Sequence, residues 1–172
     1  RTKDPRVLIG GSRLISWFTP PEVLQACSKY CDFVSVNYYW ARGYLHNLLP
    51  AAFGYVIPAG GLRRFYRIAQ KPIYITEFGL IGKNGINKNS HPAIYKTYRN
   101  QSRRAKALAR YLGRLHTDWL IGIDLFEFVD QPQNGRDMKD GENNNFGLIS
   151  RKGKVYPLFA QTLQTFFQNA FR

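Results

Sequence analysis

One glutamate stands at the end of a run of strand-forming residues. Glu77 follows residues 73–76, a β-branched and aromatic run typical of a buried strand, and it precedes Phe78 and Gly79. A carboxylate in this position can serve as a nucleophile when neighbouring polar groups orient it and exclude water. The sequence therefore indicates Glu77 as a candidate catalytic residue. The alternative is a structural carboxylate that pairs with an arginine such as Arg13 or Arg42.

Two polar side chains at the end of an earlier strand could orient such a carboxylate. Residues 32–40 are β-branched and aromatic, and Asn37 and Tyr39 lie near their end. In a strand these two residues point the same way, whereas Tyr38 points to the opposite face. An asparagine amide and a tyrosine hydroxyl can both hydrogen-bond a carboxylate or a sugar hydroxyl. We therefore predict that Asn37 and Tyr39 lie beside the Glu77 carboxylate.

The elements that must position these residues alternate between strand and helix. The patterns predict strands over residues 6–13, 32–40, 71–80 and 119–130, and helices over 19–30 (with Thr19 as N-cap), 61–70, 93–116 and 157–171. Such alternation predicts an α/β fold with a parallel sheet, and four units are half of an eightfold barrel. Functional residues of a barrel lie at the carboxyl ends of its strands. We expect residues 1–172 to form one half-barrel with no second domain.

Charge is unevenly distributed along the chain. The formal net charge is +14, which would attract polyanions of any class. Within the helix predicted over 93–116, Arg99, Arg103, Lys106, Arg110 and Arg114 share one face, and Ala105, Leu108, Leu112 and Leu115 the opposite one. The aromatic residues instead concentrate in the strands. This separation argues against a nucleic-acid-binding module, which combines aromatic and cationic side chains on one surface.

Three motifs in sequence order resemble a known clan of enzymes. The segments "DFVSVNYY", "KPIYITEFG" and "LFEFVDQP…GENNNFGLI" are similar to strands six, seven and eight of retaining glycoside hydrolases with (β/α)8 barrels. This clan carries its catalytic glutamates on strands four and seven, and the similarity is to its agarase-like and β-galactosidase-like members. On this resemblance "VLIGGSR" is strand five, and the chain is the C-terminal half of the barrel.

The resemblance implies roles for individual residues. Glu77 is the nucleophile, Tyr39 hydrogen-bonds it, and Asn37 lies beside it. Further residues expected to contact the carbohydrate substrate are Arg13, Trp40, Phe126, Phe128 and Asp130. Trp40 is equally well explained as a rim or core aromatic residue. Asp130 has an alternative structural role, in which it accepts hydrogen bonds from backbone amides of the following loop.

Retaining hydrolysis needs a second carboxyl group as acid and base. In the clan it lies on strand four, and the chain contains no strands one to four and no "NE" dipeptide. Candidates within the chain are Glu22, Glu127 and Glu142. We therefore expect a hydrolase of β-linked galactan or a related polysaccharide that is inactive as this chain alone. The alternatives are an inactive half-barrel, which would self-associate or bind a missing N-terminal half through open sheet edges, and a module that binds polyanions or nucleic acid.

No metal or other cofactor is expected. The histidines His46, His91 and His116 lack ligand spacing, and Cys27 and Cys31 lack nearby histidines. The two cysteines are expected to be free, buried thiols. The longest apolar runs are shorter than the ~20 residues of a membrane span, so no membrane partner is expected. The first residues lack the features of a secretory signal, and the compartment stays open.

Overall fold

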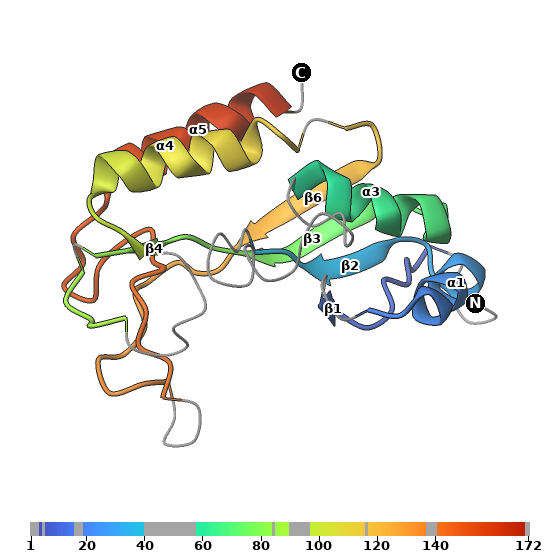
Figure 1. Ribbon diagram of the computed structural model, residues 1–172, viewed down its shortest axis with the longest axis horizontal. Coiled ribbons are helices and arrows are strands. Elements are labelled where there is room, and N and C mark those ends of the chain that lie inside the picture. The colour runs from blue at the N-terminus through green and yellow to red at the C-terminus, as the bar shows by residue number, and fades with distance from the viewer. Residues whose placement is uncertain are drawn as a thin grey trace, which may run out of the picture. The chain divides into compact units, whose positions relative to one another are not determined.

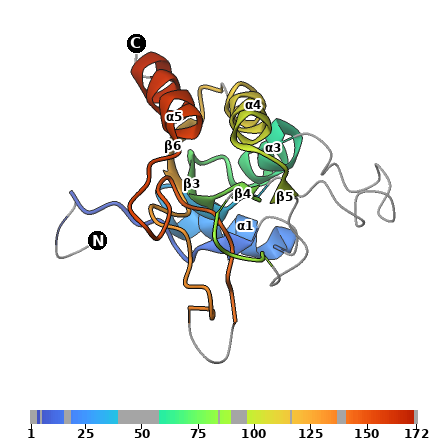
Figure 2. The same cartoon turned by 90° about the vertical axis from the view of Figure 1, so that its left-hand side faces the viewer.

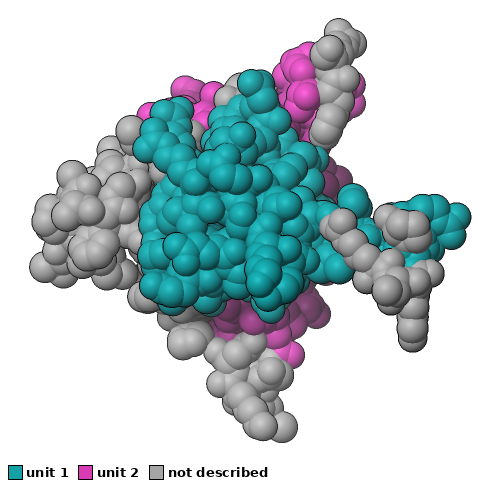
Figure 3. Space-filling view, turned by 90° about the vertical axis from the view of Figure 1, so that its right-hand side faces the viewer, with its two compact units in different colours: residues 1–38, 51–78, 117–124 teal, residues 39–50, 79–116, 125–172 magenta. Residues whose placement is uncertain are grey.

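The computed structural model describes residues 4, 6–15, 19–39, 58–83, 85–89, 97–115, 117–136 and 141–170. The chain divides into two compact units (Figure 3). Unit 1 comprises residues 1–38, 51–78 and 117–124, and unit 2 comprises residues 39–50, 79–116 and 125–172. The single half-barrel domain expected from the sequence stays a prediction. No helix in the described residues is both long and apolar enough to cross a membrane.

Unit 1 is built on a sheet with the strand order β1-β2-β3-β6. The strands are β1 (Leu14–Ile15), β2 (Val34–Asn37), β3 (Ile73–Phe78) and β6 (Leu120–Leu125). Neighbours β1 and β2, and β2 and β3, pair in parallel, and the arrows of β2, β3 and β6 point the same way in Figure 1. Helices α1 (Pro21–Tyr30) and α3 (Pro58–Ala69) occur between successive strands and pack against each other. The predicted parallel α/β fold is confirmed.

The central strands of this sheet separate apolar from polar side chains. Val34, Val36, Ile73 and Ile75 are fully buried. Tyr38 is also buried and packs against α3, where a Cβ added to Gly61 would lie 2.8 Å from the tyrosine hydroxyl. Burial raises the pKa of Tyr38. The intervening residues on β2 and β3 are polar or tyrosine, and they include the candidate nucleophile.

The first predicted elements of unit 1 are shifted. The strand predicted over residues 6–13 does not form in the described part of that range. Strand β1 begins at Leu14 instead. Gly11 interrupts the extended chain with a φ of +66°, and its missing side chain leaves room for Cys31, whose Sγ would lie 2.8 Å from an added Cβ. Thr19 is not the N-cap of α1. That position is Pro20, and the Thr19 hydroxyl donates to the Ile15 carbonyl instead.

Unit 2 contains two packed helices and a short sheet. Helices α4 (Gln101–Leu112) and α5 (Pro157–Ala170) pack along each other (Figure 2), and β4 (Ile81–Gly82) pairs in parallel with β5 (Thr97–Tyr98). The helix predicted over 93–116 was too long at both ends, and residues 93–96 and 116 lie outside the described residues. Asn100 caps α4, since its side chain accepts a hydrogen bond from the Arg103 amide at 2.9 Å.

The predicted division of this helix into two faces is confirmed. Ala105, Leu108, Leu112 and Leu115 are buried, whereas Arg99, Arg103, Lys106, Arg110 and Arg114 are exposed. The strand predicted over 119–130 is shorter, because β6 ends at Leu125. The residues after Leu125 form isolated β-bridges and loop hydrogen bonds within unit 2.

Arg104 lies in the interior of unit 2. Arg104 is 0% exposed. Its Nε donates to the Leu80 carbonyl at 2.8 Å, and its Nη2 donates to the Phe146 carbonyl. The guanidinium lies over the Phe159 ring, 3.8 Å from its centroid. Burial lowers the pKa of Arg104 to about 10, although the nearby Asp130 favours the charged form. Arg104 is charged at neutral pH and joins three separate segments of the unit.

Replacing this arginine with an uncharged side chain of similar length should destabilise the protein. We expect Arg104→Met to lower the free energy of unfolding by roughly 3 kcal/mol, because two buried carbonyls lose their donor and the buried Asp130 loses a nearby positive charge. Denaturant unfolding would measure this change. The neighbouring Arg103→Met, at an exposed position, should change stability by less than about 0.5 kcal/mol. Equal effects of the two substitutions would contradict a structural role for Arg104.

Candidate active site

A shift in strand register brings the candidate nucleophile opposite its predicted neighbour. Val36 on β2 pairs with Ile75 on β3, but the next residue, Asn37, pairs with Glu77 rather than Thr76. One extra residue is thus accommodated in β3. Such irregularities re-aim side chains at the ends of strands and are common next to active sites. Here the shift places the Asn37 and Glu77 side chains at the same point of the sheet.

Asn37 and Arg13 contact the Glu77 carboxylate. The Asn37 amide donates to Oε2 at 2.8 Å, and an Arg13 guanidinium nitrogen lies 3.2 Å from the same oxygen. The Glu77 side chain is 16% exposed and that of Arg13 is 59% exposed. Backbone pairing also fixes the end of the strand, because the Tyr38 amide donates to the Glu77 carbonyl at 2.8 Å. The carboxylate is therefore positioned by both backbone and side-chain contacts and still reaches solvent.

The Asn37 side chain is itself held in place. Its Oδ1 accepts a hydrogen bond from the Thr76 hydroxyl at 3.3 Å, which directs the NH2 group toward Glu77. Because of the register shift, Thr76 has no Cα partner opposite it on β2. The bulged residue thus supports the residue that orients the candidate nucleophile. Thr76 was not identified from the sequence, because only the register shows that Thr76 and Asn37 meet.

Polar contacts continue on the neighbouring strand pair. The Tyr74 hydroxyl donates to Asp124 Oδ2 on β6 at 2.6 Å, and this bond raises the pKa of Tyr74. Gly122 makes room for the tyrosine ring, since an added Cβ would lie 2.7 Å from it. On the other side, the Ser35 hydroxyl donates to the carbonyls of Gly10 and Ser12 at 3.2 Å. Polar side chains therefore run across the sheet from the segment before β1 to β6.

The two contacts of Glu77 should differ in their effect on stability. We expect Arg13→Gln to cost less than about 0.5 kcal/mol, because the ion pair is largely exposed. Asn37→Ala should cost about 1 to 2 kcal/mol, because it removes a part-buried hydrogen bond to a charged group and leaves Thr76 without its acceptor. Thermal or denaturant unfolding of both variants checks this order. A larger loss for Arg13→Gln would show that the ion pair, and not the amide, holds the carboxylate.

The remaining predicted site residues belong to unit 2 or lie outside the described residues. Trp40 is outside them, as is Arg42. Tyr39 and Phe126 both contact the ring of Phe146, with centroid separations of 6.0 and 5.4 Å. Phe128 is 65% exposed. Phe146 was not identified from the sequence, although it lies in the motif "NNNFGLI" that carried the resemblance.

Asp130 is buried within unit 2 and is 2% exposed. Its Oδ1 accepts a hydrogen bond from the Gly147 amide at 2.8 Å, and its Oδ2 accepts one from the Tyr156 hydroxyl at 2.6 Å. Burial raises the pKa of Asp130, and these two hydrogen bonds act in the opposite direction. These contacts match the alternative structural role, in which Asp130 holds the loop that follows β6. A contact with substrate stays a prediction.

Two carboxylates and an arginine meet in the loop after β6. Glu142 Oε2 accepts a hydrogen bond from Gln131 at 2.7 Å and lies 3.1 Å from Arg136. Glu127 is half-buried nearby, and its Oε1 has no hydrogen-bond partner. Burial raises the pKa of Glu127 to about 7; Arg136 opposes this shift and Glu142 adds to it. Glu127 therefore changes charge near neutral pH.

The raised pKa of Glu127 makes a testable contribution to stability. The unfolded chain releases this proton near pH 4.5 and the folded chain near pH 7. Folding therefore becomes less favourable as the pH rises between these values, because the unfolded state binds fewer protons. We expect Glu127→Gln to gain stability relative to the wild type across this window, with a constant difference above it. Unfolding measured from pH 4 to 8 checks this, and a difference independent of pH would contradict it.

No metal site is evident in the part of the chain that the structure describes. No three His, Cys, Asp or Glu side chains there are grouped so that they could hold an ion. His46, His91 and His116 lie outside the described residues. The chemistry available to the described site is that of carboxylates, amides, hydroxyls and guanidinium groups.

Comparison with known proteins relates the chain to polysaccharide-degrading enzymes. No protein family model matches it. In sequence it is similar to beta-agarase A of Vibrio sp. (strain JT0107), with 26% identity over 163 residues that cover 94% of this chain and 15% of the agarase. The chain is related to glycoside hydrolases. It spans only a small part of the length of this relative.

Solved structures give the same relationship. PfGH50B matches with a TM-score of 0.74 and 26% identity over 97% of this chain and 21% of that protein. The agarase AgWH50C matches with a TM-score of 0.71 and 25% identity over 98% of this chain and 22% of that protein. An exo-beta-agarase, at 23% identity and a TM-score of 0.75, supports the fold. The parallel sheet with alternating helices thus corresponds to part of a TIM-barrel-like glycoside hydrolase fold.

Proposed function

We propose that this chain is part of a retaining glycoside hydrolase that cleaves a β-linked galactan, with Glu77 as its nucleophile. The observation that carries the proposal is the placement of Glu77 at the carboxyl end of β3, where Asn37 and Arg13 bind the same carboxylate oxygen. Functional residues of barrel enzymes occupy this end of the strands. The similarity to agarases supports galactan as the substrate class.

In this mechanism the Glu77 carboxylate attacks the anomeric carbon as the glycosidic bond breaks. The leaving oxygen takes a proton from a second carboxyl group, and water then cleaves the glycosyl ester on Glu77. Asn37 and Arg13 keep the carboxylate in the geometry of attack.

The proton donor is assigned to a residue outside these 172. Retaining enzymes hold their two carboxyl groups about 5 to 5.5 Å apart. Three carboxylates of unit 1 have other positions or partners: Asp124 is bonded to Tyr74 on β6, Asp32 accepts a hydrogen bond from the Ile9 amide, and Glu22 lies in the first turn of α1. The small share of the agarases that this chain spans supports a donor from elsewhere.

Covalent labelling tests the nucleophile without requiring the proton donor. A dinitrophenyl 2-deoxy-2-fluoro-β-galactoside has a leaving group that needs no proton, and its fluorine slows hydrolysis of the resulting ester. We expect mass spectrometry to find one glycosyl adduct, on the peptide that contains Glu77. Glu77→Gln should abolish the adduct, whereas Glu22→Gln, at an exposed position on α1, should keep it.

The same substitution has a second readout in a longer protein that contains this chain. There Glu77→Gln should reduce turnover of agarose by at least about 1000-fold while the unfolding transition is preserved. Unchanged turnover, or an adduct on another carboxylate, would refute the assignment of Glu77 as nucleophile.

A further inference from the structure

Unit 2 contains a long segment without acidic residues. Residues 81–116 include no aspartate or glutamate and nine lysines and arginines. Helix α5, which packs along α4, has no charged residue at all. The positive charge of α4 therefore has no compensation from its own helix or from the neighbouring one.

Four of these cations surround a groove beside the first turns of α4. It has a volume of about 330 Å³ and is lined by Thr97 and Tyr98 of β5 together with Arg99, Arg103, Lys106 and Arg110. All four cationic side chains belong to exposed residues. Within the described residues, no carboxylate lies at ion-pair distance from any of them. We call this the basic groove.

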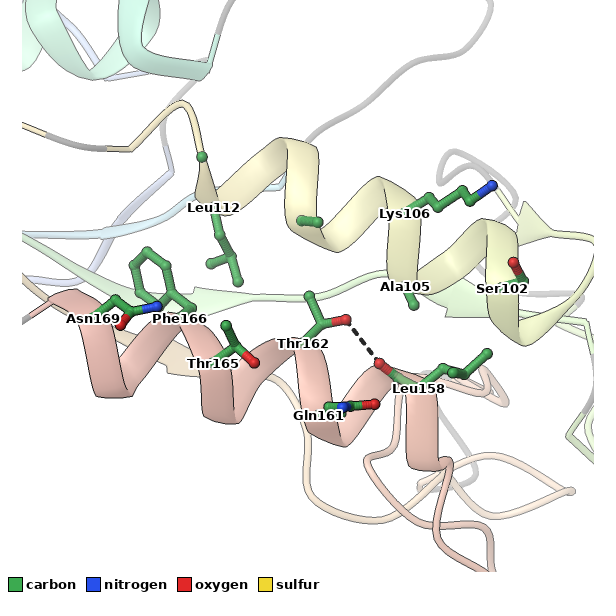
Figure 4. A pocket seen from close by; sticks show the side chains of 12 residues that line it. Ser102, Ala105, Lys106, Leu112, Leu158, Gln161, Thr162, Thr165, Phe166 and Asn169 are labelled. Atoms are coloured by element: carbon green, nitrogen blue, oxygen red, sulfur yellow. Dashed lines mark hydrogen bonds between the residues drawn. The ribbon is translucent and has the colours of Figure 1, made fainter.

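A second groove runs between α4 and α5 (Figure 4). Its volume is about 550 Å³, and Lys106 lines both grooves. Alanine, leucine and phenylalanine side chains line part of it. Hydroxyl and amide groups also line it, from Ser102, Gln161, Thr162, Thr165 and Asn169, and Lys106 is the one charged residue among the lining residues that the structure describes. The Thr162 hydroxyl donates to the Leu158 carbonyl at 2.7 Å, so its oxygen can still accept a hydrogen bond. We call this the neutral groove.

We propose that the two grooves together bind an anionic polysaccharide, a sugar chain that carries sulfate or carboxylate groups. Guanidinium and ammonium groups in the basic groove match the oxyanions. Hydroxyl and amide groups in the neutral groove match sugar hydroxyls, and Phe166 offers an apolar ring for a sugar face. The inference rests on the proposed function, because it assigns the charged form of the same class of polymer to a surface that does not include Glu77.

The lining residues favour this partner over nucleic acid. Proteins that bind single strands stack successive bases on several aromatic side chains. Each groove here has one aromatic lining residue, Tyr98 or Phe166. Positive charge and hydroxyl or amide groups can bind a phosphate as well as a sulfated sugar. The lack of successive stacking residues in either groove therefore favours a glycan over a single-stranded nucleic acid.

Binding to three polymers by the 172-residue chain tests the proposal. The probes are a sulfated galactan, a neutral galactan and duplex DNA, each at about 50 and about 200 mM salt. The test variant is Arg99→Gln/Arg103→Gln/Arg110→Gln. The control is Arg63→Gln/Arg67→Gln/Arg151→Gln, which removes three exposed arginines elsewhere. Both variants have a net charge of +14 − 3 = +11. Thermal unfolding verifies that each variant is folded.

We expect the wild type to bind sulfated galactan more tightly than DNA, with an affinity that falls as salt rises. The test variant should lose about tenfold in affinity and the control less than about threefold. A fourth variant, Thr162→Val/Thr165→Val, should weaken binding to sulfated galactan and leave binding to DNA unchanged.

Several results would overturn the inference. Equal losses in the two triple variants would assign the attraction to net charge alone. Tighter binding to DNA than to sulfated galactan would assign the surface to another class of partner. Absence of binding to sulfated galactan would show that the two grooves do not bind an anionic polysaccharide. Glu77→Gln should leave this binding unchanged. Failure of the labelling experiment at Glu77 is therefore distinguishable from failure of the surface.

Discussion

The pairing of β2 with β3 determines where the functional side chains of unit 1 point. Because side chains alternate along a strand, a slip of one residue would exchange the buried and the polar faces. The register holds Val34 and Val36 beside Ile73 and Ile75 in the core, and then changes by one residue at the end of the pair. The apolar pairs fix the strands, and the irregularity that follows them aligns Asn37 with Glu77. Stability and chemistry are thus provided by successive parts of the same pair of strands.

Unit 2 is organised around a buried charge and around hydrogen-bonded loops. Arg104 joins the segment after β3 to the segment before α5. Asparagines link the loop after β4 to the loop after β6: the Asn145 side chain donates to Asn87 and Asn89, and Asn87 donates to Gln131. Gly85 permits this approach, since an added Cβ would lie 1.9 Å from Asn145 Oδ1. Loops distant in sequence therefore have defined conformations without regular secondary structure.

The sequence predicted those features of the fold that depend on patterns of neighbouring residues. Alternation of strands and helices gave the α/β fold, and strand period separated Tyr38 from Asn37. The ends of elements were less predictable, because the Asn100 cap sets where α4 begins, and a positive φ at Gly11 interrupts the strand predicted over 6–13. The roles of Thr76, Phe146 and Arg104 depend on which residues of different segments meet. A solvated arginine and a buried one look alike in sequence, particularly in a helix where Arg103 is exposed and Arg104 is not.

The two cysteines at the C-terminal end of α1 offer a way to follow local motion of the molecule in solution. Cys27 and Cys31 are free and buried, as the sequence predicted, and Cys31 lies against the backbone of Gly11. Burial, together with the neighbouring Cys31, raises the pKa of Cys27 to about 11. Because the thiolate is the reactive form, burial and the raised pKa slow the reaction of this thiol at neutral pH as long as α1 stays in place. Local opening of the helix would accelerate its alkylation, so the native chain contains its own chemical reporter of fluctuations at this edge of unit 1.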